Sequence, residues 1–298
     1  MNAIWRICDG DGGYFYSHQD ITDAALKHFK NQYSRGMGCA IRDILWGIEL
    51  FPTMFDDDIN DSIFQLITED ELHGILKAFS KEKCPGPDGW TIEFFIQFFD
   101  IIKHDLIRMI EESRISGHIH PHTSSTLIAL IPKKRDAESF SDYRPISLCN
   151  ISFKIISKII AERIKGTLAT HLSKDQHAFL KGWNILDAVA FTQECIFSMF
   201  SKSIDGAVLK IDLQKAYDCI GWGFIKSLLA KIGLRVEMIS WIMACIEDVN
   251  YAININGIPS PYFRAERGLR QGCPLAPIIF ILAMNTLSLH INKAVNEQ

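Results

Sequence analysis

An apolar segment with one aspartate near its end constrains this chain more than any other feature. It reads VLKIDL, residues 208–213, and QKAYDCIGW follows it directly. Side chains of a β-strand alternate between two faces, so Leu209, Ile211 and Leu213 would share one face and pack on a core. Asp212 would then lie on the opposite face, late in the strand.

A helix is predicted directly after this strand. Tyr217, Ile220, Phe224 and Leu228 follow at helical spacing, and Gly233 would end the helix. A strand, turn and helix that hold a carboxylate at the turn commonly present a metal ligand. The competing interpretation is an ordinary half-exposed strand with a polar outer face, and this unit alone does not decide between them.

Composition limits the class of protein. With 298 residues, 48% of them apolar, the chain can form one large domain or two small ones around a sizeable core. Its eight cysteines are far apart in the sequence, so no pair has the spacing of a zinc site. We expect reduced thiols in an intracellular protein, nuclear or cytoplasmic. Neither a signal peptide nor a membrane span is expected, because the longest apolar run, 278–284, is short.

Charge is distributed unevenly. The first eighty residues are acidic, whereas residues 131–181 carry ten Lys and Arg against five Asp and Glu. A basic segment in an acidic chain could face the phosphates of a nucleic acid. A solvated helix face is the simpler interpretation of the same charges.

Several further elements are predicted from periodicity and turn signals. A strand should end at Pro132, and Thr22 could cap the helix at 21–35. The other expected helices are 69–84, 91–113, 150–172, 187–200 and one that begins near Leu275. The mixture indicates an α+β fold that is rich in helix.

A second constrained motif is GLRQGCPLAP, residues 268–277, which leads into an apolar helix. Gln271 and Gly272 stand just before Pro274. At such a turn a glycine lets the backbone and a neighbouring side chain approach a ligand closely.

Together these motifs resemble the reverse transcriptase of non-LTR (LINE-type) retrotransposons, of the sort abundant in plants. The resemblance covers most of residues 60–298. Six blocks occur in the family's order: KCPGPDGW (83–90), TLIALIPKK (126–134), DYRPISLCNISFKIISKIIAERI (142–164), QHAFLKGWNILDA (176–188), LKIDLQKAYDCIGW (209–222) and GLRQGCPLAP (268–277).

The resemblance implies a right-hand polymerase with fingers and a partial palm of antiparallel strands. Residues 1–60 would be a linker region upstream of the polymerase, 61–205 the fingers and 206–298 the partial palm with motifs A and B. The expected reaction is RNA-directed DNA synthesis by two-metal nucleotidyl transfer.

The resemblance also implies the roles of individual residues. Asp212 and the backbone carbonyl of Leu213 would bind Mg²⁺, together with two aspartates of an [FY]-x-D-D hairpin. Tyr217 would be the steric gate that favours deoxynucleotides, with a core aromatic as the alternative. Lys215 and Asp218 would have structural or salt-bridge roles.

Further family positions would bind the incoming nucleotide. Lys133 and Arg144 would clamp its triphosphate, and Gln271 and Gly272 would pack by its sugar and the templating base. The expected partners are an RNA template, a DNA primer and dNTPs, with no membrane. The sequence indicates no oligomeric state.

The chain also departs from the family pattern. Ala178 replaces a glycine, Trp183 an arginine and Ala276 a serine, and these changes affect residues expected near the template. The sequence reaches Gln298 before an [FY]-x-D-D hairpin, so we expect this chain to be inactive alone, because one carboxylate cannot hold two metal ions. A non-catalytic RNA-binding fragment or a transposon relic is the alternative.

Two acidic stretches imitate metal sites. Residues 55–58, Phe-Asp-Asp-Asp, fit F-x-D-D formally and would imply a permuted palm, but an acidic loop explains them better. Residues 9–20 place aspartates at positions 1, 3 and 12 of a calcium loop. Tyr14 stands where that loop needs glycine, so a glycine-rich turn is the better interpretation.

Overall fold

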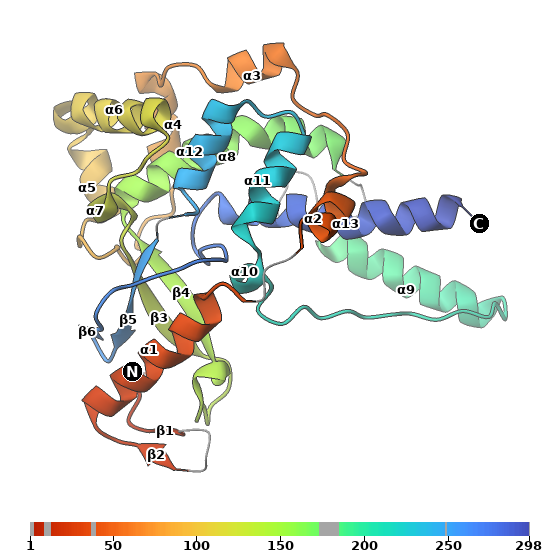
Figure 1. Cartoon of the computed structure of the whole chain (residues 1–298), viewed down its shortest axis with the longest axis horizontal. Coiled ribbons are helices and arrows are strands. Elements are labelled where there is room, and N and C mark those ends of the chain that lie inside the picture. Colours follow the sequence, from red (N-terminus) through yellow and green to blue (C-terminus); the bar gives the residue numbers. More distant parts are fainter. Residues whose placement is uncertain (1–2, 9–12, 37–39, 173–184, 248, 298) are drawn as a thin grey trace.

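A computed structural model describes residues 3–8, 13–36, 40–172, 185–247 and 249–297. Most helices gather at one end of a five-stranded sheet, and this mixture of helix and sheet confirms the α+β class (Figure 1). The strands follow the order β4-β3-β5-β6, and β7 also pairs with β5. The hairpin of β1 (Ile7–Cys8) and β2 (Tyr14–Phe15) is separate from this sheet.

The sheet is mixed. β3 (Thr126–Pro132) pairs along its whole length with antiparallel β4 (Tyr143–Cys149) and lies parallel to β5 (Asn250–Ile255). β6 (Ile258–Pro259) and β7 (Phe263–Arg264) pair antiparallel with β5. The prediction of a strand that ends at Pro132 is therefore confirmed. Antiparallel strands were expected in residues 206–298, where β5 pairs antiparallel with β6 and β7, whereas β3, which precedes that region, lies parallel to β5.

Helix α1 (His18–Tyr33) packs on the sheet (Figure 1). It begins at Ser17, whose Oγ accepts a hydrogen bond from the Asp20 N–H at 3.1 Å. The expected cap, Thr22, is wrong, because Thr22 is buried inside the helix and its hydroxyl donates to the His18 carbonyl. This core contains Ile21, Ala25, Phe29 and Tyr33 of α1 with Ile128, Tyr251, Ile253 and Ile255 of the sheet.

A larger core forms around α8 (Ile151–His171). The helical period predicted for this segment is confirmed, because its apolar positions are buried: Ile151, Ile155, Ile156, Ile159, Ile160, Ile164 and Leu168. The helices that contribute to the same core include α4 (Glu69–Lys77), α11 (Trp222–Lys231), α12 (Val236–Ala244) and α13 (Ala276–Asn296).

Two predicted helices are each divided in two. Residues 91–113 form part of α5 (Ile92–Gln97) and α6 (Phe99–Ser116), because Phe98 leaves the helical conformation at φ −101° and ψ 15°. The helix expected after the aspartate segment is α10 (Ala216–Cys219) followed by α11. Four of the described α-helices had no predicted counterpart: α2 (Ile41–Ile48), α3 (Asp57–Ile63), α7 (Pro121–Ser124) and α12.

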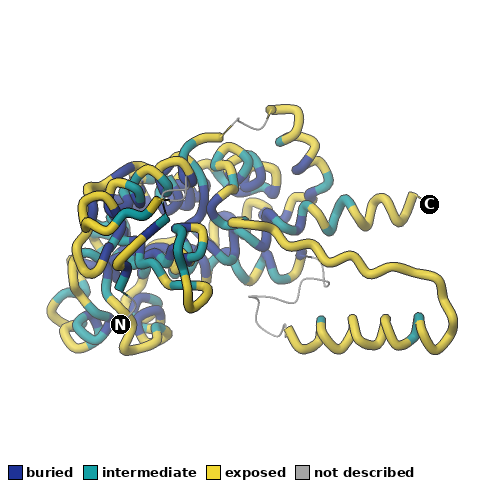
Figure 2. The backbone as a smooth tube through the Cα atoms, turned by 90° about the horizontal axis from the view of Figure 1, so that it is seen from below, coloured by how far each residue is buried: buried dark blue, intermediate teal, exposed yellow. Residues whose placement is uncertain are grey.

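The predicted strand at 208–213 is wrong, because this segment is extended but pairs with no described strand and is exposed throughout. The preceding helix α9 (Ile185–Ser201) also has no buried residue. Helix α9 and the first part of this segment stand away from the rest of the molecule (Figure 2), whereas Ile211 and Leu213 line a cavity. β3 and β5 each have neighbours on both sides, so neither offers this segment a free edge.

One described helix, α13, is long and apolar enough to cross a membrane by length and composition alone. Its first turns contribute Ile278, Ile279 and Leu282 to the larger core. A core helix gives the same signal, so this helix is weak support for a membrane span.

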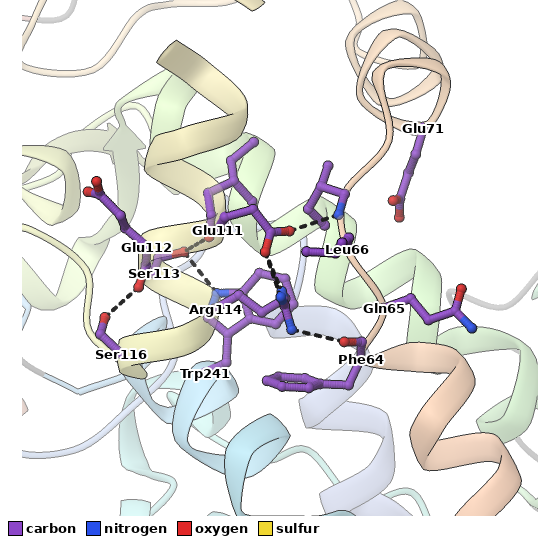
Figure 3. A network of polar contacts seen from close by, with 12 residues as sticks. Phe64, Gln65, Leu66, Glu71, Glu111, Glu112, Ser113, Arg114, Ser116 and Trp241 are labelled. Carbon is purple, nitrogen blue, oxygen red and sulfur yellow. Dashed lines mark hydrogen bonds and ion pairs between the residues drawn. The ribbon is translucent and has the colours of Figure 1, made fainter. Parts of the chain in front are cut away.

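A largely buried ion pair within α6 also binds the backbone of the segment after α3 (Figure 3). Arg114 donates to Glu111 at 2.6 Å and to the Phe64 carbonyl at 2.9 Å. The other oxygen of Glu111 accepts from the Ile67 N–H at 2.8 Å. Nearby, the Trp241 indole donates to Ser113 Oγ at 3.0 Å and so ties α12 to α6.

We expect Arg114→Ala to lower the free energy of unfolding by about 3–5 kcal/mol, because it leaves the Glu111 carboxylate, whose side chain is only 15% exposed, without its cation. Arg108→Ala is the matched control, because Arg108 forms an exposed pair with Asp105 in the same helix. That control should cost less than about 1 kcal/mol. Urea unfolding measures both, and equal losses would contradict the importance of the buried pair.

Candidate functional site

A cavity of about 750 Å³ lies where the β3–β4 hairpin, α10 and the first turn of α13 meet. Six of the seven predicted site residues line it: Lys133, Arg144, Leu213, Tyr217, Gln271 and Gly272. The seventh, Asp212, is the neighbour of Leu213 and is exposed. The fold thus gathers residues that lie up to 139 positions apart in the sequence, from Lys133 to Gly272.

The β3–β4 hairpin supplies the cationic part of the cavity wall. Lys133 follows β3, and Arg144 is the second residue of β4; both side chains are exposed. Lys133 donates from its ammonium group to the Ser141 carbonyl at 2.8 Å and from its N–H to the Asp142 carbonyl at 2.8 Å. These two bonds hold the lysine beside the end of its own hairpin.

Asp142 organises that hairpin. One carboxylate oxygen lies 3.0 Å from the Lys134 ammonium, and the other accepts from the N–H groups of Glu138 and Ser139 at 3.1 Å each. The contact with Lys134 is the main reason that the pKa of Asp142 falls to about 2, helped by the bonds from the backbone.

A carboxyl group whose pKa is lower in the folded state stabilises the fold above its unfolded pKa, and this contribution is lost as pH falls through the folded value. We therefore expect the hairpin to loosen between pH 4 and 2, the interval between the ordinary value of 3.8 and about 2. Hydrogen exchange of the Glu138 and Ser139 amides should rise over this interval, beyond the intrinsic pH dependence. Asp142→Asn should weaken the protection already at pH 7, whereas Asp136→Asn should not.

Tyr217 lies in the wall of the cavity, in contact with α13. Its ring stacks on Phe280 with centroids 4.3 Å apart and planes 15° from parallel. Burial raises the pKa of the phenol. The ring is half-buried and also packs on the larger core, so the steric-gate role stays a prediction.

The turn at 268–273 is held by close backbone contacts that require glycine. Gly268 has φ +91°, and a Cβ there would lie 2.8 Å from the Asp218 carbonyl oxygen. Gly272 has φ +127°, and its Cβ would lie 2.7 Å from the Ser147 carbonyl oxygen. Ser147 also donates its N–H to the Gln271 carbonyl at 2.8 Å, so the turn is fixed to β4.

Asp218 is buried in the same wall and links three parts of the chain. It accepts hydrogen bonds from Gln32 at 2.9 Å, Tyr33 at 3.2 Å and Gln271 at 3.3 Å. Burial raises the pKa of Asp218 despite these donors. A structural role was predicted for Asp218. No sequence signal indicated its partners Gln32 and Tyr33, because they lie in α1, 186 and 185 residues before it.

Arg270 is a second residue that sequence reasoning missed. It is 3% exposed, donates to the Ser124 carbonyl at 3.0 Å and lies 3.9 Å from the centroid of the Phe153 ring. These contacts connect the turn to α7 and α8. Arg270 precedes Gln271 in the recognised motif, and that position is the one signal that could have found it.

Neither acidic stretch that imitates a metal site forms one within the described residues. Asp56 caps α3, and Asp57 and Asp61 bind Arg235, so residues 55–58 belong to a helix start and not to a palm hairpin. Residues 9–12 of the calcium-like stretch lie outside the described residues, and Asp20 is in the first turn of α1.

Comparison with known proteins gives the family. Residues 131–298 match the family model described as reverse transcriptase (RNA-dependent DNA polymerase). This chain belongs to that family. The match covers more than half of the chain and includes every wall residue named above except those of α1. The resemblance to non-LTR retrotransposon reverse transcriptases is thereby confirmed.

Three relatives agree with this assignment. The transposon TX1 uncharacterized 149 kDa protein of Xenopus laevis is 29% identical over 218 residues, 73% of this chain and 17% of that protein. Pol polyproteins of R2 elements from Popillia japonica and Drosophila melanogaster are 24% and 23% identical over 75% and 76% of this chain. The chain spans 30% or less of the length of each of these three relatives.

Reverse transcriptases depend in general on a divalent metal ion. Among the described residues, however, no three His, Cys, Asp or Glu side chains come together as ligands would. Asp218 is occupied by three donors, which leaves Asp212 and one backbone carbonyl. One carboxylate and one carbonyl cannot by themselves hold the two metal ions of a polymerase, so the described residues supply at most part of a metal centre. Ala178 and Trp183 lie outside the described residues, and Ala276 starts α13.

Proposed function

We propose that the cavity binds the incoming deoxynucleoside triphosphate during RNA-directed DNA synthesis. One observation carries this proposal: six residues selected from the sequence for nucleotide binding line a single cavity. Its volume of about 750 Å³ falls in the range of small-molecule sites, about 300–1,000 Å³.

The charges and shapes of the wall suit the parts of a nucleotide. Lys133 and Arg144 can form charge-assisted hydrogen bonds to phosphate oxygens. Tyr217, stacked on Phe280, gives a rigid surface that would exclude a sugar with a 2′ hydroxyl group and so favour deoxynucleotides. Gln271 and Gly272 would lie by the sugar and the templating base.

We further propose Asp212 and the Leu213 carbonyl as ligands that this chain contributes to Mg²⁺. A bound metal would supply Lewis-acid stabilisation of the transferring phosphate. Mg²⁺ would need further oxygen ligands besides these two, such as water and the phosphates of the nucleotide. The proposed macromolecular partners are an RNA template and a DNA primer, whose phosphates would face the basic segment 131–181.

We expect the chain to bind a fluorescent dATP analogue, and Lys133→Ala or Arg144→Ala to weaken this binding roughly tenfold each, because each removes a cation from the triphosphate. Arg135→Ala is the control, since Arg135 is exposed on the same hairpin but does not line the cavity. Fluorescence anisotropy measures the affinities. Equal effects of all three variants would show a general charge effect and contradict a site in the cavity.

Template-directed selection distinguishes a polymerase site from a general anion site. With an RNA template and annealed DNA primer bound, the dNTP complementary to the templating base should bind more tightly than the other three. Gln271→Ala should reduce this preference, and Arg135→Ala should not. Binding of the template and primer without any nucleotide selection would favour the non-catalytic RNA-binding alternative.

A further inference from the structure

Asp218 is a buried residue, 1% exposed, and its carboxylate can only accept hydrogen bonds when it is ionised. Its two oxygens divide the donors between them. Oδ2 accepts from Gln32 Nε2, and Oδ1 accepts from the Tyr33 hydroxyl and from Gln271 Nε2. Each of these side chains must therefore turn its donor toward Asp218.

The Gln32 amide has its direction fixed from both ends. Its Oε1 accepts from the Lys215 ammonium at 2.6 Å, and its Nε2 donates to Asp218 at 2.9 Å. An ammonium group can only donate and a carboxylate can only accept, so a flipped amide would lose both bonds. Gln32 thus connects the cation of Lys215 to the anion of Asp218 through α1.

Lys215 is held in an unusual conformation for this contact. It has φ 51° and ψ 35° directly before α10, a left-handed conformation that residues other than glycine rarely adopt. Its carbonyl accepts from the Asp218 N–H at 2.9 Å. Lys215 and Asp218 are therefore joined through the backbone of α10 as well as through Gln32.

The same logic applies to Gln271, which lines the cavity. Because its Nε2 donates to Asp218, its Oε1 must point away from the carboxylate. The amide then offers the cavity an acceptor, and a ligand with an O–H or N–H donor is favoured there. Without Asp218 the two ends of the amide could exchange places.

We propose that Asp218 is a positioning residue that sets which end of the Gln271 amide faces the cavity, and that α1 holds Asp218 for this task through Gln32 and Tyr33. The identity of the ligand rests on the proposed function: a nucleotide or template base that donates to Gln271 Oε1. Helix α1 lies outside residues 131–298, the part that matches the family model.

The contact can be tested without any ligand by NMR of the full chain with ¹⁵N in the glutamine side chains. The resonance pair that Gln271→Met removes belongs to Gln271. Asp218→Asn should shift this pair and speed its exchange with water, because an Asn amide can donate as well as accept. Asp187→Asn, an exposed control on α9, should leave it unchanged. An unchanged Gln271 pair in Asp218→Asn would overturn the proposal.

A titration of the unmodified chain covers the case in which Asp218→Asn does not fold. The Gln271 pair should follow one ionisation whose pKa lies above the ordinary carboxyl value, since burial raises the pKa of Asp218. A Gln271 pair that does not respond to the carboxyl ionisation would reject the contact.

Nucleotide affinity separates this proposal from the proposed function. Asp218→Asn and Gln271→Met should each weaken dATP binding roughly tenfold, and the double variant should be no weaker than either, because both act through one contact. Additive losses would contradict a positioning role. If the unmodified chain binds no dATP, the proposed function fails, and the Gln271 resonances still decide the role of Asp218.

Discussion

The pairing of β3 with a strand on each side is the constraint on which the rest of the structure depends. Its antiparallel partner β4 returns the chain so that Arg144 lies near Lys133. Its parallel partner β5 comes from more than a hundred residues later and brings the segment that leads to Gln271. With both edges of β3 used, one core forms between α1 and the sheet and a larger one around α8.

The cavity depends on a close approach of the turn at 268–273 to α10 and β4. Gly268 and Gly272 let the turn touch α10 and β4 at distances that no Cβ would allow. Two buried charged side chains extend from this region in different directions. Arg270 reaches toward α7 and α8, and Asp218 toward α1, so this region contacts helices of both hydrophobic cores.

The sequence predicted those parts of the fold that depend on local patterns. The isoleucine period of α8 and the proline at the end of β3 are local, and both predictions are confirmed. Motif order was sufficient to select six residues that share a cavity, although spacing alone left Asp212 with two interpretations. Asp212 and its strand show the limit, because alternation predicts which face a side chain occupies but not whether a neighbouring strand exists. The contacts of Gln32 and Tyr33 with Asp218 could not be predicted either, since nothing in one sequence indicates that residues 185 or more positions apart will meet.

Because α1 packs on the sheet, the part of the chain that matches the family model and the part that packs as one core begin at different residues. The match to the family model begins at residue 131. The folding unit begins earlier, because Phe29 and Tyr33 of α1 share one core with Phe140 and Tyr251. A fragment that began at residue 131 would lack α1. Phe140 and Tyr251 would then be exposed to water, and Asp218 would lose two of its hydrogen-bond donors. The boundary of the family match therefore differs from the boundary of the packed structure, which includes α1.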